Sequence, residues 1–274
     1  MRIVVCVKEV LDPDAVDAYA LSGGLIIGDD GRSITQSTIP RLMNGYDEQA
    51  IEAALRIKDA GGDCTVSVVS IGPDPTTVLR HASALGADDV TAIEPPPTGG
   101  DDHHVVAALL SAFIRSTGGA ELVLCGRQAS DDDQGVVPAL IGADLDMAVI
   151  TVAQDVAVHH DPDGPTVRVV RVTPDGPETV QARCPAVVTV SSELGEPRYP
   201  TMPQKMAARK VTPTLVNPDE LPVGDGGLTT RARLVRQYVP AVKGDCEIIA
   251  GDGPAATAQE LIDRLIDDKV LRSR

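Results

Sequence analysis

Residues 2–8 read RIVVCVK, residues 64–71 read CTVSVVSI and residues 121–125 read ELVLC. Each stretch is nearly continuous in apolar, often β-branched residues, which is typical of a strand buried on both faces of a sheet. A further strand is predicted at residues 89–93. Apolar residues at helical spacing predict intervening helices at residues 47–60, 74–86, 101–117 and 136–145. This alternation of strands and helices predicts a parallel sheet with right-handed crossovers.

The pattern changes after residue 148. Three strand-like runs follow, joined by short turns rich in Pro, Gly and Asp, so they are expected to pair antiparallel as hairpins. These runs cover residues 148–158, 166–173 and 178–183, and a last buried strand is predicted at 186–191. Residues 12–32 are expected to be turn-rich, with a small strand at 25–27. The fold class is therefore a doubly wound, mostly parallel α/β sheet with antiparallel hairpin additions.

The C-terminal part has a different character. Seven prolines between residues 193 and 242 predict an extended arm that holds no regular core. Residues 257–271 carry an apolar stripe at helical spacing and predict a final helix. A helix of this length is marginal by itself, so the stripe is expected to pack against another surface.

Composition narrows the function classes. The 274 residues are 43% hydrophobic but only 2% aromatic, which suits a core of Val, Ile, Leu and Ala. A formal net charge of −16 disfavours binding to nucleic acid or anionic membrane surfaces. No apolar run reaches the roughly 20 residues that a membrane-spanning helix needs, so membrane insertion is not expected. Five widely spaced cysteines and an N-terminus unlike a signal peptide predict a reducing, cytoplasmic location, without disulfides or a metal site.

Ligands of open α/β sheets bind beyond the carboxyl ends of the parallel strands. Three such ends stand out, at residues 6–8, 70–73 and 126–135. The last is a loop with three carboxylates, which suit a cation, ribose hydroxyls or backbone N–H groups, but which also occur in ordinary solvated turns. The sequence has no G-x-G-x-x-G fingerprint after a strand, no P-loop and no persuasive hydrolytic triad, so no catalytic residues are assigned.

Several short motifs occur in a fixed order along the chain. They are IVVCVKEV at 3–10, MNGYDE at 43–48, VSIGP at 69–73, LGAD at 85–88, LVLCGRQASDDD at 122–133, PAVVTV at 185–190 and EPRYPTMP at 196–203. In this order and register, over residues 1 to about 210, the chain resembles the β subunit of electron transfer flavoprotein.

The resemblance implies an electron carrier rather than an enzyme. It implies a heterodimer with an α subunit, which carries electrons from acyl-CoA or other flavin dehydrogenases to a quinone oxidoreductase or another acceptor. The α subunit would hold most of the FAD, and this chain would bind AMP. Two alternatives stay open: an electron-bifurcating form with a second FAD and NADH oxidation in this chain, and a regulatory module that binds an adenine nucleotide.

The matched motifs also imply site residues. The nucleotide is expected to contact Cys6, Asn44, Gly45, Tyr46, Asp47, Ile71, Gly126, Arg127, Gln128, Asp131, Asp133, Gln134, Gly135, Val136 and Val137. Residues expected to dock a dehydrogenase are Arg198, Met202, Lys205, Arg209 and Lys210. The chain is accordingly divided into a nucleotide-binding α/β domain (1–190), a partner-recognition loop (191–210) and a C-terminal arm and helix that pack on the α subunit (211–274).

Three departures from the family pattern affect these expectations. A side-chain amide and a glycine of the phosphate loop are replaced at residues 136–138, so a phosphate would depend more on backbone N–H groups. Met202 stands where a Leu is usual, and its flexible thioether suits an adaptable anchor. Asn44-Gly45 replaces the usual Asn-Pro.

Overall fold

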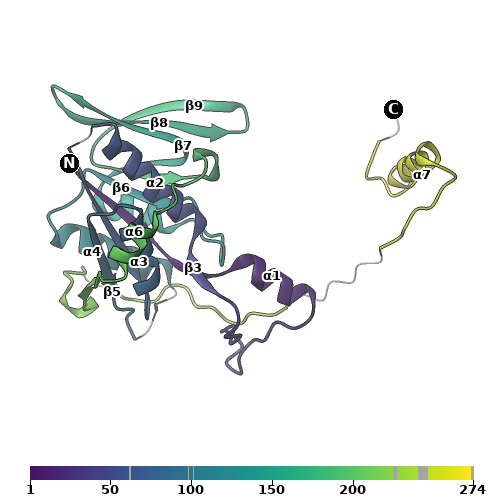
Figure 1. The fold of residues 1–274 in the computed structure, drawn as a ribbon, viewed down its shortest axis with the longest axis horizontal. Coiled ribbons are helices and arrows are strands. Elements are labelled where there is room, and N and C mark those ends of the chain that lie inside the picture. Colours follow the sequence, from purple (N-terminus) through teal and green to yellow (C-terminus); the bar gives the residue numbers. More distant parts are fainter. Residues whose placement is uncertain (62, 98, 101, 225–226, 240–245, 273–274) are drawn as a thin grey trace. The chain divides into compact units, whose positions relative to one another are not determined.

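The three apolar runs become neighbouring strands of one sheet (Figure 1). In the computed structural model β1 (Arg2–Val7) lies between β4 (Thr65–Ile71) and β6 (Leu122–Gly126), parallel to both. The strand order of this nine-stranded sheet is β11-β5-β4-β1-β6-β10-β7-β8-β9. The structure describes residues 1–274 except 62, 98, 101, 225–226, 240–245 and 273–274. The chain forms two compact units, Met1–Tyr238 and Val239–Arg274.

The outer strands complete the predicted fold class. β5 (Asp89–Ile93) and β10 (Ala186–Val190) continue the parallel part on either side. β7 (Ala148–Asp161) starts parallel to β10 and then pairs antiparallel with β8 (Gly164–Thr173), which pairs antiparallel with β9 (Gly176–Arg183). The doubly wound sheet and its hairpin additions are therefore confirmed. The pairing of β7 with two kinds of neighbour follows from its length, since its first part lies beside β10 and its second part continues past it.

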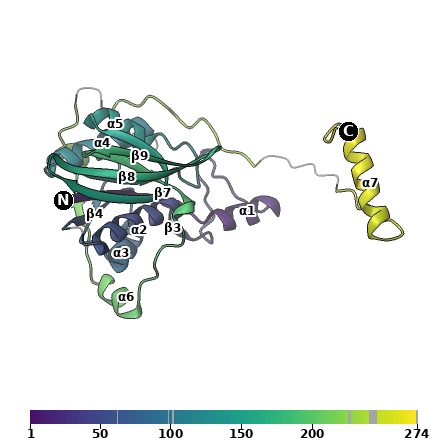
Figure 2. The same cartoon turned by 90° about the horizontal axis from the view of Figure 1, so that it is seen from above.

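Helices cover both faces of the sheet (Figure 2). On one side α2 (Gly45–Asp59) and α3 (Thr76–Leu85) share one buried apolar cluster with Ile3 and Val5 of β1. On the other side α4 (His103–Ser116) and α5 (Val137–Leu145) share a second cluster with Val4 and Cys6. Successive β1 residues thus face opposite layers, as the period of two requires. The predicted start of α4 at residue 101 lies outside the described residues.

Two expectations about irregular chain were wrong. Residues 12–32 contain α1 (Pro13–Leu21), and no residue of α1 is buried, so the helix leaves no apolar stripe in the sequence. Residues 25–27 form no strand, only a single bridge between Ile27 and Ile34. β2 (Glu9–Leu11) and β3 (Arg41–Met43) pair as a two-stranded antiparallel sheet, which brings together the two ends of the segment between them.

The proline-rich stretch is also more regular than expected. It contains the short helices η1 (Ser192–Leu194), α6 (Met202–Ala208) and η2 (Pro218–Glu220). It also contains β11 (Thr214–Val216), which joins the edge of the main sheet parallel to β5. Part of the expected arm is therefore built into the first unit, because the prolines flank these short elements or begin them. Expectations for residues 225–226 and 240–245 lie outside the described part.

The second unit contains α7 (Pro254–Asp267), which begins three residues earlier and ends four residues earlier than the predicted helix. No residue of α7 is buried. None of the helices within the described residues combines the length and apolar character that crossing a bilayer requires.

Candidate functional site

The order of the strands defines where a crevice should open. The chain leaves β1 on one side to build β4 and β5, and then returns to the other side of β1 with β6. This reversal makes the carboxyl ends of β1 and β6 the topological switch point, where ligands of such sheets bind. The residues that follow are Lys8 after β1 and the loop that starts at Arg127 after β6.

One buried carboxylate links the two strand ends. Asp47, in the first turn of α2, accepts hydrogen bonds from the backbone N–H of Lys8 (2.8 Å) and of Gly126 (3.0 Å). Burial raises the pKa of Asp47 to about 7, against the opposing hydrogen bonds. Gly126 must be a glycine here, because a Cβ at this position would lie 2.4 Å from Asp47 Oδ1 and 2.7 Å from Tyr46 Cβ.

Asn44 fixes the loop that follows β6. It stands at the start of α2, but its side chain makes no capping bond to the helix. Instead Nδ2 donates to the carbonyl of Gln128 (2.9 Å), and Oδ1 accepts from the N–H of Ser130 (3.2 Å). A cation–π contact adds to this attachment, with the Arg127 guanidinium 5.6 Å from the centre of the Tyr46 ring. The first turn of α2 and the loop after β6 therefore form one structural unit.

The acidic residues of the loop have partners within the chain. Lys8 Nζ contacts Asp131 (2.8 Å) and Asp132 (3.4 Å), and His103 Nε2 lies 3.0 Å from Asp132. Asp133, in the left-handed region at φ 52°, accepts from Gln128 Nε2 (2.7 Å). The carboxylates therefore shape the loop, rather than gathering around a cation. In the described part of the chain, no three His, Cys, Asp or Glu side chains are arranged to hold a metal ion.

The pKa shifts of Lys8 and Asp132 are consistent with these contacts. Burial lowers the pKa of Lys8, but the hydrogen bond to Asp131 and the neighbouring carboxylates outweigh it, so the net shift is upward. Burial raises the pKa of Asp132, but the N–H of Gln134 and the charges of Lys8 and His103 hold it below its ordinary value. Both groups therefore keep their charge, and the loop is cross-linked by ion pairs.

The remaining expected residues lie at the same edge of the sheet. Cys6 is buried in the layer of α4 and α5, in register with Cys125, and its hydrogen bond together with burial raises the pKa of the Cys125 thiol. Ile71 ends β4, next to β1, and is half-buried. Gly45 leaves open space where a Cβ would stand. Gln134, Gly135 and Val136 lead into α5, which begins at Val137. In this first turn the N–H groups of Val137 and Ala139 have no partner within the helix, and Pro138 has no N–H.

The sequence places Lys8 and Asp132 within the strand-end segments 6–8 and 126–135 without naming them as individual contacts, and it does not indicate His103. Lys8 was recognisable as the polar residue directly after the first strand. The histidine gave no signal, because only the folded chain brings the start of α4 beside the loop after β6.

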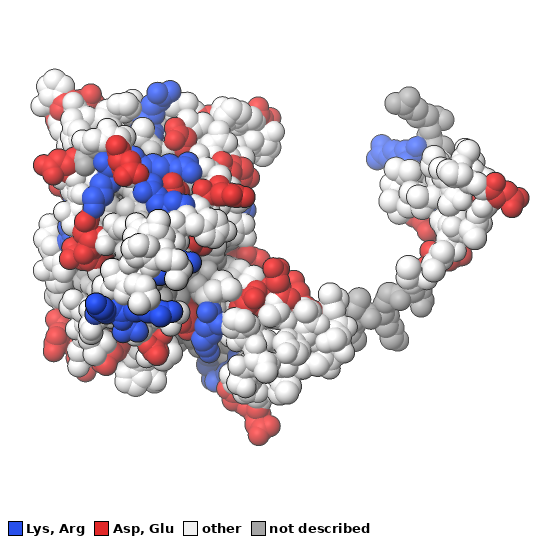
Figure 3. Space-filling view, viewed as in Figure 1, with Lys and Arg blue, Asp and Glu red and all other residues white. Residues whose placement is uncertain are grey.

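The residues expected to dock a dehydrogenase differ in their exposure and in their contacts. Met202 is 67% exposed at the first position of α6, and Lys205, Arg209 and Lys210 are exposed. Arg198, in contrast, directs its guanidinium to Glu52 (2.7 Å) and Asp59 (2.8 Å). Figure 3 shows an uncharged area over α6 bordered by lysines and arginines. Tyr199 (88% exposed) and Met206 (51%) belong to the same surface, although sequence reasoning did not assign them.

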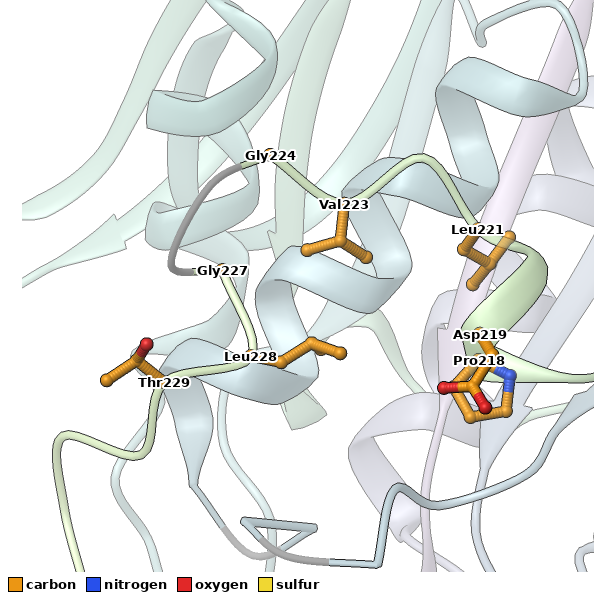
Figure 4. A pocket seen from close by; sticks show the side chains of 8 residues that line it. All are labelled: Pro218, Asp219, Leu221, Val223, Gly224, Gly227, Leu228 and Thr229. Atoms are coloured by element: carbon orange, nitrogen blue, oxygen red, sulfur yellow. The ribbon is translucent and has the colours of Figure 1, made fainter.

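A cavity of about 500 Å³ lies elsewhere in the first unit (Figure 4). A single stretch of chain between Pro218 and Thr229 provides its lining, with the apolar side chains of Leu221, Val223 and Leu228. It shares no residue with the strand ends at Val7 and Gly126. Its lining includes none of the residues that the sequence motifs indicate, so the switch point remains the stronger candidate.

Fold and site together define an open, doubly wound α/β protein whose candidate binding residues gather at the switch point of its sheet. Residues 32–221 match the family model described as Electron transfer flavoprotein domain. The chain therefore belongs to the electron transfer flavoprotein family, and its resemblance to the β subunits of that family is confirmed.

Three relatives illustrate the range of similarity. The electron transfer flavoprotein subunit beta of Megasphaera elsdenii is 29% identical over 283 residues, which cover 99% of this chain and all of that protein. The caffeyl-CoA reductase-Etf complex subunit CarD of Acetobacterium woodii is 30% identical, with 99% and 100% covered. The acryloyl-CoA reductase electron transfer subunit gamma of Anaerotignum propionicum is 31% identical, with 74% and 72% covered.

Proposed function

We propose that this chain is the β subunit of a heterodimeric electron transfer flavoprotein, which carries electrons from flavin dehydrogenases to a quinone oxidoreductase or another acceptor. The proposal is supported by family membership and by one observation, the junction at which Asp47 joins the ends of β1 and β6. FAD, held mostly by the α subunit, supplies the redox chemistry when bound. The residues of this chain bind and position, and none is assigned a catalytic role.

The switch point at the ends of β1 and β6 is proposed to hold an adenine nucleotide, AMP. Its residues fit such a group in two respects. The N–H groups of Val137 and Ala139 in the first turn of α5 suit a phosphate, since a helix N-terminus favours an anion, whereas Pro138 between them has no N–H to donate. The carboxylates that would repel a phosphate are already paired, Asp131 and Asp132 with Lys8 and Asp133 with Gln128. Each carboxylate is thus turned toward a partner within the chain, and backbone N–H groups remain available to hold the phosphate.

The α subunit is proposed to cover α7 and the chain around it. Within the second unit, Leu261 and Ile262 are 46% and 43% exposed, which suits an apolar contact with a partner. A complex of this kind is expected to bury well above the roughly 1,600 Å² of a standard interface. Residues 196–210 are proposed to dock the dehydrogenase, with Met202 as the apolar anchor and the basic residues around it steering association.

One experiment tests the proposal and separates its variants. The chain is co-purified with the product of a neighbouring α-subunit gene, the bound nucleotides are extracted, and flavins are counted per heterodimer. One FAD with one AMP is expected. Two FAD would indicate the bifurcating form, and an adenine nucleotide without any flavin or α subunit would indicate a regulatory module and refute the carrier function.

A variant tests the loop itself. Asp133→Lys removes the acceptor of Gln128 and adds a cation where the loop turns, so the purified complex is expected to lose AMP. The measure is the content of AMP per heterodimer after gel filtration. Unchanged content would remove Asp133 from the site.

A further inference from the structure

Side chains of α2 form hydrogen bonds with the segment that leads to α6. Gln49 Nε2 donates to the carbonyls of Ser192 (3.3 Å) and Gly195 (3.4 Å). About two turns further along, Arg56 donates to the carbonyl of Leu194 (3.0 Å). α2 therefore carries the candidate nucleotide residues at its start and the segment before the docking surface along its length.

The attachment of this segment to α2 ends at a cluster of charged side chains around the buried Glu52. The side chain of Glu52 is 7% exposed and accepts from Nε of Arg198 (2.7 Å) and Nε of Arg56 (2.8 Å). It also accepts the backbone N–H of Arg198 (3.1 Å), and Asp59 takes the second arm of the same guanidinium (2.8 Å). Hydrogen bonds between charged groups are roughly twice as strong as neutral ones, and this arrangement restrains both the side chain and the backbone of Arg198.

The other end of the segment is held as well. Arg80 of α3 donates from Nε to the carbonyl of Val211 (3.0 Å). Between the two attachments lies α6, a helix of seven residues with a capping box formed by Thr201 and Gln204. Such a short helix is marginal by itself, so its orientation depends on what fixes its two ends and on α3, which it contacts.

We propose that Glu52 and Arg198 form a clamp that positions α6 for docking, and that Arg198 acts through this clamp rather than by touching the dehydrogenase. The inference rests on the proposed function, because docking by residues 196–210 is part of that function. Glu52 is then a positioning residue for electron transfer, although it lies on α2 and outside the docking segment.

The surroundings of Glu52 explain why neither partner is interchangeable. A buried carboxylate is costly unless it is paired, and Arg56 and Arg198 provide its two cations. Removing the guanidinium of Arg198 leaves Glu52 with Arg56 as its only cation, so that the backbone N–H of residue 198 alone ties the segment to Glu52. Removing the charge of Glu52 leaves Arg198 with the exposed Asp59, which is a weak partner in water.

The test uses the intact heterodimer with the variants Glu52→Gln, Arg198→Gln and the double variant. Lys58→Gln is the matched control, since it breaks an ion pair of α2 with Asp88 that does not touch the segment. Amide hydrogen exchange of residues 199–210 is expected to speed up about tenfold in both single variants, as loss of a charged hydrogen bond implies. The control is expected to leave this exchange unchanged. The double variant is expected to match the single variants, because both remove one interaction.

Kinetics then separate positioning from general structural damage. With a purified acyl-CoA dehydrogenase reduced by its acyl-CoA, the KM for the carrier is expected to rise about tenfold, with kcat unchanged. Met202→Ala serves as the reference for docking. Unchanged exchange in the clamp variants would overturn the inference, as would unchanged KM in these variants when Met202→Ala raises it. If Met202→Ala also leaves KM unchanged, the docking assignment itself fails, and the role of the clamp fails with it.

Discussion

Asp47 shows how a single residue joins the parts of this site. Its two oxygens each accept one backbone N–H, from Lys8 and from Gly126, so its charge lies between the ends of two neighbouring strands. Its backbone lies in the first turn of α2, the helix that covers these strands. The strand ends, the helix and the loop after β6 are therefore coupled through one side chain, and changes at Asp47 should affect all of them.

Asp47→Asn is expected to destabilise the chain by about 1–3 kcal/mol, because the NH₂ group would face an N–H donor and leave it unpaired. The pKa of about 7 in the folded chain lies above the ordinary value, so Asp47 contributes stability below about pH 4 and loses that contribution as pH rises through about 7. The advantage of wild type over the variant should therefore shrink between pH 5 and pH 8. Urea unfolding at both pH values measures this, and an advantage that grows with pH would contradict it.

Gly126→Ala is expected to open the same junction from the other side. The new Cβ would lie 2.4 Å from Asp47 Oδ1, so the carboxylate or the strand end has to move. We expect a loss of bound nucleotide and a lower unfolding midpoint. The control is Gly24→Ala, whose Cβ would meet only ordinary contacts, the nearest at 3.5 Å. Equal nucleotide content in both variants would show that Gly126 tolerates a side chain.

At the scale of elements, the parts with a regular apolar pattern were predictable from sequence, whether buried as in β1 or exposed as in α7, and the parts without such a pattern were not. β1, β4 and β6 and the helices between them carry strong apolar patterns because both faces of the sheet are covered. α1 buries no residue, and α6 buries only Ala208, so neither helix leaves a usable period. The motifs located the site loop, but its partners Lys8 and His103 come from distant positions that only the fold brings together.

The start of α4 illustrates an element that also holds a distant segment. Asp102 caps the helix through the N–H of His104 (2.8 Å) and accepts the N–H of Arg231 and of Ala232. Burial raises the pKa of Asp102, but these backbone hydrogen bonds outweigh it and lower the value to about 2. One carboxylate thus fixes the chain beyond β11 to the main sheet unit.

Asp102→Ala is expected to speed up amide exchange at residues 231 and 232 and to lower the free energy of unfolding by about 1–3 kcal/mol. Because the pKa in the folded chain lies below the ordinary value of about 3.9, this stability is present above about pH 4 and is lost as pH falls through about 2. Hydrogen exchange by mass spectrometry measures the first effect. If exchange at these amides stays at the wild-type rate, the segment is held by other contacts.

At the scale of the whole molecule, charge and apolar surface are unevenly distributed. The chain has a formal net charge of −16, yet the exposed residues Lys205, Arg209 and Lys210 lie close together at and after α6. A basic region on an acidic protein favours association with an acidic partner surface in one orientation. The second unit offers a different kind of surface, because α7 exposes apolar side chains and buries none of its residues.

Leu261→Ser combined with Ile262→Ser is expected to weaken the heterodimer about 100-fold. Each side chain should contribute about 1.5 kcal/mol if the α subunit covers it, and 1.4 kcal/mol corresponds to a tenfold change in Kd. The stability of residues 1–238 should not change, since these two residues belong to the other compact unit. Glu260→Gln is the control on the same helix, because it removes only the exposed ion pair with Arg264. Analytical ultracentrifugation of the co-purified subunits measures the Kd. If the double variant binds the α subunit as tightly as the control, α7 is not part of the interface, and the subunits associate through the first unit.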